Sequence, residues 1–160
     1  MLETLRLFGA AAVAAALLYV ASGWDPAAAQ APRQIKLTEK QVESFIAAQK
    51  KMAVAKADSE LGSIAKEHGF VSIEEHDEVE ANILLVMDGI DPQSMTFTEP
   101  PVQIARLIEE VKADKALPEA DRKQALEELS EALKDAQPIQ FPSNIELVKK
   151  YFDKIKAALQ

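Results

Sequence analysis

The amino-acid sequence predicts an all-α protein, a compact bundle of five or six helices around a central apolar helix at about residues 73–90. Three observations lead to this prediction. Apolar residues recur at the three- and four-residue spacing of amphipathic helices through most of the chain. No run of alternating polar and β-branched residues is long enough for a strand. Residues typical of helix starts and ends, among them eight prolines and five glycines, separate the periodic segments.

The composition is that of an ordinary globular protein and argues against several classes of function. The 160 residues are 48% hydrophobic and 28% charged, and the formal net charge is −8. A nucleic-acid-binding protein needs a basic surface, which this acidic composition does not provide. The chain has no cysteine, so that disulfides and thiolate chemistry are excluded. We therefore expect a fold that depends on its hydrophobic core alone.

The first 29 residues are typical of a secretory signal peptide. Arg6 precedes a continuous apolar run over residues 7–20, and the alanines at residues 27–29 give the small-x-small pattern of a cleavage site. We expect a cut after Ala29, export to the periplasm and no stable membrane insertion after cleavage. The alternative is an uncleaved membrane anchor, but the run is shorter than the roughly 20 apolar residues that span a membrane.

The mature chain is predicted to begin with a flexible arm at residues 30–37, followed by a single α-helical domain at residues 38–160. Thr38 and Gln41 have the spacing of a capping box, in which each side chain bonds the other residue's backbone N–H. The stripe of the first helix is Val42, Phe45, Ile46, Gln49 and Ala53. This pattern continues through Ile64, with a break near Gly62, and Gly69 is expected to end it because glycine tolerates a left-handed turn.

The segment from Ile73 to Ile90 is predicted to be the central helix, because its second half is apolar almost all round. One face carries Val79, Ile83, Val86 and Ile90, and Leu84 and Leu85 lie to either side. A second capping box, Ser72 with Glu75, is expected to open this helix. Asp91 precedes a proline and should end it, because the residue before a proline avoids helical angles.

Three further helices are predicted, separated by a turn and by two proline-rich joints at residues 91–101 and 137–144. One has the stripe Ile104, Leu107, Ile108 and Val111. The next begins near Pro118 and has the stripe Ala125, Leu126, Leu129, Ala132, Leu133 and Ala136. Ser143 with Glu146 should cap the last, whose stripe is Ile145, Val148, Tyr151, Phe152, Ile155 and Leu159.

The two joints carry large apolar residues where loops are usually polar, namely Met95, Phe97, Ile139 and Phe141. If these side chains are exposed together, they form a patch for a protein partner or an apolar ligand. The alternative is that they fold back and close the ends of the bundle.

Two histidines are candidates for polar sites. His76 and Glu80 are one helical turn apart and could bind a metal ion, with Asp77 or a more distant carboxylate as a further ligand. The alternative is a partly buried histidine that bonds Glu80 or a carbonyl group. His68 lies at an expected helix end, where a cation is favoured. The group Asp88, Asp91 and Glu99 lacks the alternating pattern of a calcium loop.

No constellation of residues predicts catalysis. No serine lies in a G-x-S-x-G turn, and nothing in the spacing of the two histidines indicates a Ser-His-Asp triad. We therefore expect a non-enzymatic exported protein without a cofactor. It would bind a protein partner or unfolded chains. The alternatives are a metal-binding periplasmic protein and a structural subunit of an envelope complex.

The sequence LTEKQ at Leu37–Gln41 resembles the LTxxQ motif of a family of small periplasmic helical proteins that includes the chaperone Spy. The motif usually occurs twice in that family, and the nearest second copy here is LPEAD at Leu117–Asp121, in which Pro118 and Asp121 replace Thr and Gln. The resemblance implies an exported helical protein, of a kind in which some members hold unfolded proteins. The chain as a whole also resembles acidic exported helical proteins of Gram-negative bacteria.

Overall fold

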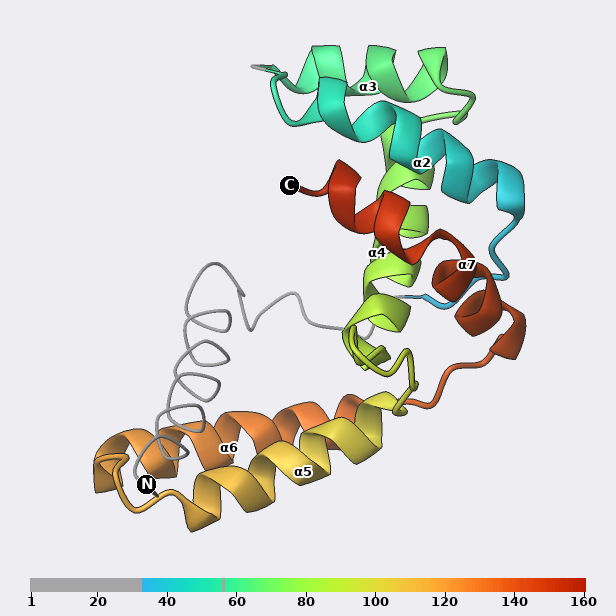
Figure 1. The fold of residues 1–160 in the computed structure, drawn as a ribbon. Coiled ribbons are helices and arrows are strands. Elements are labelled where there is room, and N and C mark those ends of the chain that lie inside the picture. Colours follow the sequence, from blue (N-terminus) through green and yellow to red (C-terminus); the bar gives the residue numbers. More distant parts are fainter. Residues whose placement is uncertain (1–32, 56) are drawn as a thin grey trace, which may run out of the picture. The chain divides into compact units, whose positions relative to one another are not determined.

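The computed structural model describes residues 33–55 and 57–160, and within them it confirms the all-α prediction (Figure 1). The helices are α2 (Glu39–Met52), α3 (Asp58–Glu67), α4 (Ile73–Gly89), α5 (Pro100–Ala113), α6 (Glu119–Asp135) and α7 (Pro142–Ala158). In this part of the chain the only β-type pairing is an isolated bridge between Ile90 and Phe97. The expected signal peptide and residues 30–32 of the expected arm lie outside the described residues.

The described chain divides into two compact units, where the sequence predicts a single domain from residue 38 to residue 160. Residues 33–103 and 137–160 form one unit, which we call the four-helix unit because it holds α2, α3, α4 and α7. Residues 104–136, most of α5 with all of α6, belong to the other, which we call the helical hairpin. The chain passes from one unit to the other between residues 103 and 104, early in α5, and between residues 136 and 137, where the second joint begins.

Helix α4 has extensive contacts with three other helices of the four-helix unit. It packs against α2, α3 and α7, and α2 in turn packs against α3 and α7. The buried hydrophobic cluster consists entirely of residues of this unit and includes Phe45 on α2, Ile83 on α4 and Ile155 on α7, all with 0% exposure. Leu84 and Leu85 are half-buried. Helix α4 thus shares the core with α2 and α7, and within the unit three helices surround it rather than five.

The first predicted helix is broken earlier than expected. Helix α2 ends at Met52, and Gly62 lies inside α3 rather than at a bend. A straight continuation of the stripe of α2 would place Lys56 and Glu60 on the buried face, because both lie close to a whole number of turns from Gln49. The break resets the helical phase, and α3 then buries Ala65.

The predicted helix ends are partly confirmed. The Thr38–Gln41 capping box is present, with bonds of 3.3 Å from the Gln41 N–H to Thr38 Oγ1 and 3.0 Å from the Thr38 N–H to Gln41 Oε1. Gly69 follows α3 with a φ of +91°, as expected of a glycine at a helix end. Ser72 caps α4, but Glu75 accepts a bond from the Val71 N–H and so departs from the predicted reciprocal box.

The predicted cap of the last helix is wrong, because α7 begins at Pro142 and not after Ser143. Proline fits the first helical position, where its missing N–H costs nothing. Phe141 is the N-cap residue, and no side chain caps this end. Asn144 therefore lies within the first turn, where its side chain is buried.

The part of the expected flexible arm that the structure describes is fixed to the four-helix unit. Asn82 Nδ2 donates to Arg33 O, and Asn82 Oδ1 accepts from the Ile35 N–H at 2.9 Å. Asn144 Nδ2 donates to Ile35 O, and Asn144 Oδ1 accepts from the Leu37 N–H at 2.9 Å. Both asparagines are 2% exposed, and Leu37 belongs to the core. The side-chain amides of Asn82 and Asn144 thus make the backbone hydrogen bonds that a neighbouring strand would otherwise make with residues 33–37.

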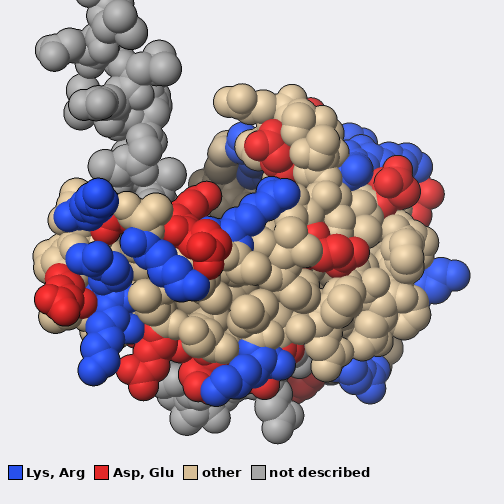
Figure 2. Space-filling model, turned by 90° about the horizontal axis from the view of Figure 1, so that it is seen from below, with Lys and Arg blue, Asp and Glu red and all other residues tan. Residues whose placement is uncertain are grey.

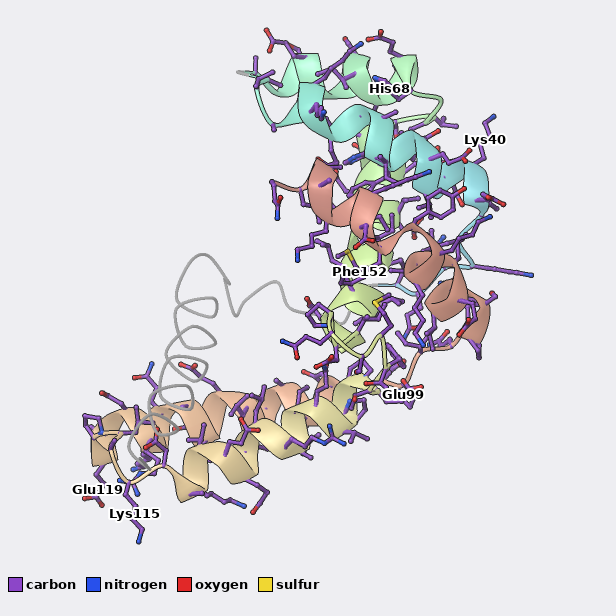
Figure 3. All side chains as sticks on the ribbon, viewed as in Figure 1. Lys40, His68, Glu99, Lys115, Glu119 and Phe152 are labelled. Carbon is purple, nitrogen blue, oxygen red and sulfur yellow. The ribbon has the colours of Figure 1, made fainter. Side chains whose placement is uncertain are left out.

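The helical hairpin has little core in its described part. Helix α5 begins at the two prolines, and α6 follows Pro118, which is its N-cap residue and provides no side-chain bond. Lys115 in the turn between these helices and Glu119 at the start of α6 are exposed (Figure 3). Only Val111 and Ala125 are buried in this range. None of the described helices is long and apolar enough to span a membrane.

Candidate functional site

The apolar residues of the two joints do not form an exposed patch. Ile139 belongs to the buried core, and Met95 and Phe97 are partly buried and packed against it. Phe141 is half-buried. Ile139, Met95 and Phe97 therefore fold back onto the core, as in the alternative prediction. A partner-binding role of these three residues and Phe141 stays a prediction, and no exposed patch supports it.

Phe97 is held close to the backbone at the end of α4. A Cβ atom added to Gly89 would lie 2.2 Å from the Phe97 ring and 2.8 Å from the carbonyl oxygen of Thr98. The Thr98 N–H also donates to Gly89 O at 2.8 Å. The joint thus needs a residue without a side chain at position 89, and the ring closes the end of the core.

Ile139 is fixed by polar contacts from the other joint. Its N–H donates to Glu99 Oε2 at 2.9 Å, and Glu99 (labelled in Figure 3) lies immediately before α5. The Gln34 side chain binds the second joint through Pro138 O and the Gln140 N–H. These bonds give the joints a structural role, which explains why apolar residues occur there.

The structure brings His76 together with both of its candidate ligands. His76 Nδ1 lies 3.1 Å from Asp77 Oδ1 and 4.0 Å from Glu80 Oε2. These three donor atoms lie within 4.8 Å of one another, and they are the only such group of three among the described residues. Asp88, Asp91 and Glu99 do not form one. The His76 side chain is 3% exposed, whereas Asp77 is 62% exposed. A buried imidazole therefore faces two carboxylates that reach water.

Two aromatic rings pack against the imidazole of His76. Phe45 stacks on His76 at a centroid distance of 5.6 Å, and Phe70 stands perpendicular to it at 5.2 Å. Gln49 Nε2 donates to Glu80 Oε1 at 3.1 Å, so the second carboxylate is oriented as well. Gln49 is a polar residue on the apolar stripe of α2, and this position is the sequence signal for its buried role. His76 Nε2 is buried and has no hydrogen-bond partner.

His68, the other histidine, is placed as predicted at the end of α3, where it is the C-cap residue (Figure 3). Its Nε2 atom is buried without a partner. Among the described residues, His68 belongs to no group of three side chains that could hold a metal ion.

A polar cluster joins α2 to α7. The Tyr151 hydroxyl lies within hydrogen-bond distance of Glu39 and Glu43, at 2.8 Å from Glu43 Oε1, and Lys150 pairs with Glu39. The hydrogen bonds from Lys150 and then from Tyr151 lower the pKa of Glu39. The same bonds to Glu39 and Glu43 raise the pKa of Tyr151. These shifts have a structural cause in the α2–α7 contact and do not indicate a catalytic group.

The helical hairpin presents a stripe of large apolar residues that the sequence predicts to be inward. On α5, Ile104, Leu107 and Ile108 are only half-buried, and on α6 the half-buried residues are Leu126, Leu129 and Leu133. Two helices alone cannot cover both flanks of such stripes. A segment of fewer than 40 residues lies between the two joints. A segment this short has little core of its own, and this is the sequence signal that could have identified it as a separate unit.

On the face seen in Figure 2, charged side chains of both signs surround the uncharged areas, and several basic side chains lie next to one another at the left, beside acidic ones. No family model, curated protein or solved structure matches the chain. The LTxxQ resemblance therefore rests on residues 37–41, whose Thr38 and Gln41 act as a capping box. Its weak second copy, at Leu117–Asp121, has no such box, since Pro118 is the N-cap residue.

Proposed function

We propose that this protein is a non-enzymatic binding protein of the periplasm, and that its helical hairpin binds an amphipathic segment of a protein partner. The observation that carries the proposal is the half-buried apolar stripe on α5 and α6, none of whose residues packs against the core cluster. An amphipathic helix of a partner would complete a three-helix arrangement and cover this stripe, which is a common mode of peptide recognition. The expected signal peptide supports the location.

The net charge of −8 favours a partner segment with basic residues. Glu127, Glu128 and Glu131 are exposed on α6, on the side of the helix away from Leu126 and Leu133. Opposite charges on two partners increase the rate of association even where they lie outside the contact itself. We therefore expect a basic amphipathic helix to bind better than an acidic one of the same apolar pattern.

The test is a binding titration of the purified chain with two fluorescent amphipathic peptides, one basic and one acidic, and with a chemically unfolded model client in a separate aggregation assay. The variant Leu126→Ser/Leu133→Ser removes two stripe residues seven positions apart. We expect it to abolish binding of the basic peptide while the circular dichroism spectrum stays helical.

The matched control is Glu127→Ser/Lys134→Ser. These residues are also seven positions apart on α6 and are exposed, and their joint removal leaves the net charge unchanged. The control should retain most of the binding. Equal binding by the wild type and the stripe variant would reject the hairpin as the binding surface. Phe141→Ala tests the joint residues in the same assay, and a loss confined to this variant would return the function to the joints.

A further inference from the structure

We propose that His76, Asp77 and Glu80 form a binding site for one divalent transition-metal ion, with Zn²⁺ as the ion that suits its donors. This inference does not depend on the proposed function, because all three residues lie on α4 in the four-helix unit and not on the hairpin.

The arrangement of the donor atoms suits a positive charge between them. Two carboxylate oxygens lie 3.1 and 4.0 Å from Nδ1 of His76. A bare Nδ1 lone pair would face both negative groups and be repelled by them. Either a proton on Nδ1 or a cation bound to it removes this repulsion, and a cation also neutralises both carboxylates.

The distances suit a metal ion. Zinc lies about 2.0–2.2 Å from nitrogen and oxygen donors, so two donors of one ion are at most about 4.4 Å apart. Both distances from Nδ1 are within this limit. The third side chain, Asp77, is exposed and can rotate to complete the set. Three protein donors leave a fourth position of a tetrahedral site for water.

The surroundings orient two of the donors in advance. Phe45 and Phe70 fix the plane of the imidazole, and Gln49 holds the Oε1 atom of Glu80, which leaves Oε2 on the side of His76. A hydrogen bond to a ligating carboxylate, such as that from Gln49 to Glu80, is typical of metal sites. Nε2 of His76 has no hydrogen-bond partner in the protein. Hence no hydrogen bond at Nε2 fixes the tautomer of the ring, and the Nδ1 lone pair can face an ion.

The donor set also selects the class of ion. One imidazole and two carboxylates suit zinc and its first-row neighbours, whereas Ca²⁺ takes six to eight oxygen ligands. The buried nitrogen is reached through Asp77 and Glu80, whose side chains are 62% and 32% exposed. The site is therefore open to ions from solution.

The test is isothermal titration calorimetry of the purified chain with ZnCl₂ and, separately, with CaCl₂, combined with NMR of the two imidazole rings. We expect one zinc ion per chain, no heat from calcium, and a shift of the His76 ring signals while those of His68 stay in place. The sequence has only two histidines, so the second ring is an internal reference.

The variant Asp77→Asn/Glu80→Gln removes the two carboxylates without changing the buried ring, and the control Glu74→Gln/Glu78→Gln changes the same charge on the same helix. We expect the first to weaken zinc binding by more than about tenfold, the loss that even an outer partner of a metal ligand can cause. The control should stay close to the wild type. Absence of zinc binding, an equal loss in both variants or a shift confined to His68 would overturn the proposal.

Discussion

The four-helix unit and the helical hairpin use similar amphipathic helices with different outcomes. In the first, α2, α4 and α7 each bury most of a stripe, and Val42, Ile83 and Val148 are fully buried, although Leu159 at the end of the last stripe is 41% exposed. In the second, α5 and α6 bury one residue each in the described range. The period of the apolar residues is the same, so the difference lies in the number of helices available to cover each stripe. Hydrophobic stabilisation follows the area removed from water, and the two units should therefore differ in stability.

The largest expected effect tests this comparison directly. Phe45→Ala would open a cavity beneath α4 and remove the ring that stacks on His76, and it should cost about 3–5 kcal/mol of unfolding free energy. Leu129→Ala in the hairpin removes a side chain that is only half-buried and should cost about 1 kcal/mol. Urea unfolding followed by circular dichroism measures both values. Similar losses for the two variants would contradict the difference between the units.

The next effect concerns the arm, which only the four-helix unit fixes. Asn144→Ala leaves the Leu37 N–H and the Ile35 carbonyl oxygen without partners, and each unsatisfied buried group costs about 1–3 kcal/mol. We expect a total loss of about 2–4 kcal/mol, in the lower part of the range for two such groups because the bond to Ile35 is only part-buried, and faster hydrogen exchange at the Leu37 amide. Gln34→Ala is the control, because its bonds to Pro138 and Gln140 are exposed. Unchanged exchange at Leu37 in the Asn144 variant would show that the arm is held in another way.

A smaller effect is expected from two glycines of the four-helix unit. Gly89→Ala would place a methyl group against the Phe97 ring and a backbone oxygen, and should cost about 1–3 kcal/mol because the backbone cannot move away cheaply. Gly62→Ala meets nothing within 4 Å inside α3 and should instead stabilise the chain by about 0.5–1 kcal/mol. Thermal unfolding of both variants shows whether each substitution raises or lowers the stability. Two changes of the same sign would remove the steric argument for Gly89.

The sequence predicted the helices well because their periods are local, and it failed where a distant partner decides. The bounds of α4 were predicted to within a residue, since Ser72 and the Asp91–Pro92 pair lie next to them. The fixed arm could not be predicted from the pattern, because it depends on Asn82 and Asn144. These residues accept hydrogen bonds from backbone N–H groups that lie 47 and 107 residues away in the sequence. Helical spacing alone predicts Glu80 beside His76, with Asp77 as one candidate for a further ligand, whereas the roles of Gln49 and the two phenylalanines depend on contacts that other segments make with α4.

The smallest expected effect depends on pH and again separates the two units. The bonds from Lys150 and Tyr151 lower the pKa of Glu39, so this group stabilises the folded state above its unfolded pKa of about 4.5, and the contribution is lost as the pH falls through the lower folded value. Glu39→Gln should therefore lower the urea midpoint at pH 7 and have less effect at pH 3. Glu131→Gln in the hairpin breaks an exposed pair with Lys134 on the same helix, three residues away, and should change neither midpoint measurably. A link between α2 and α7, which are more than 100 residues apart, opposes unfolding of the whole unit, whereas a bond within one turn persists in any state in which that turn stays helical. If Glu39→Gln had the same effect at both pH values, the Glu39 carboxylate would not be the group that stabilises the α2–α7 contact.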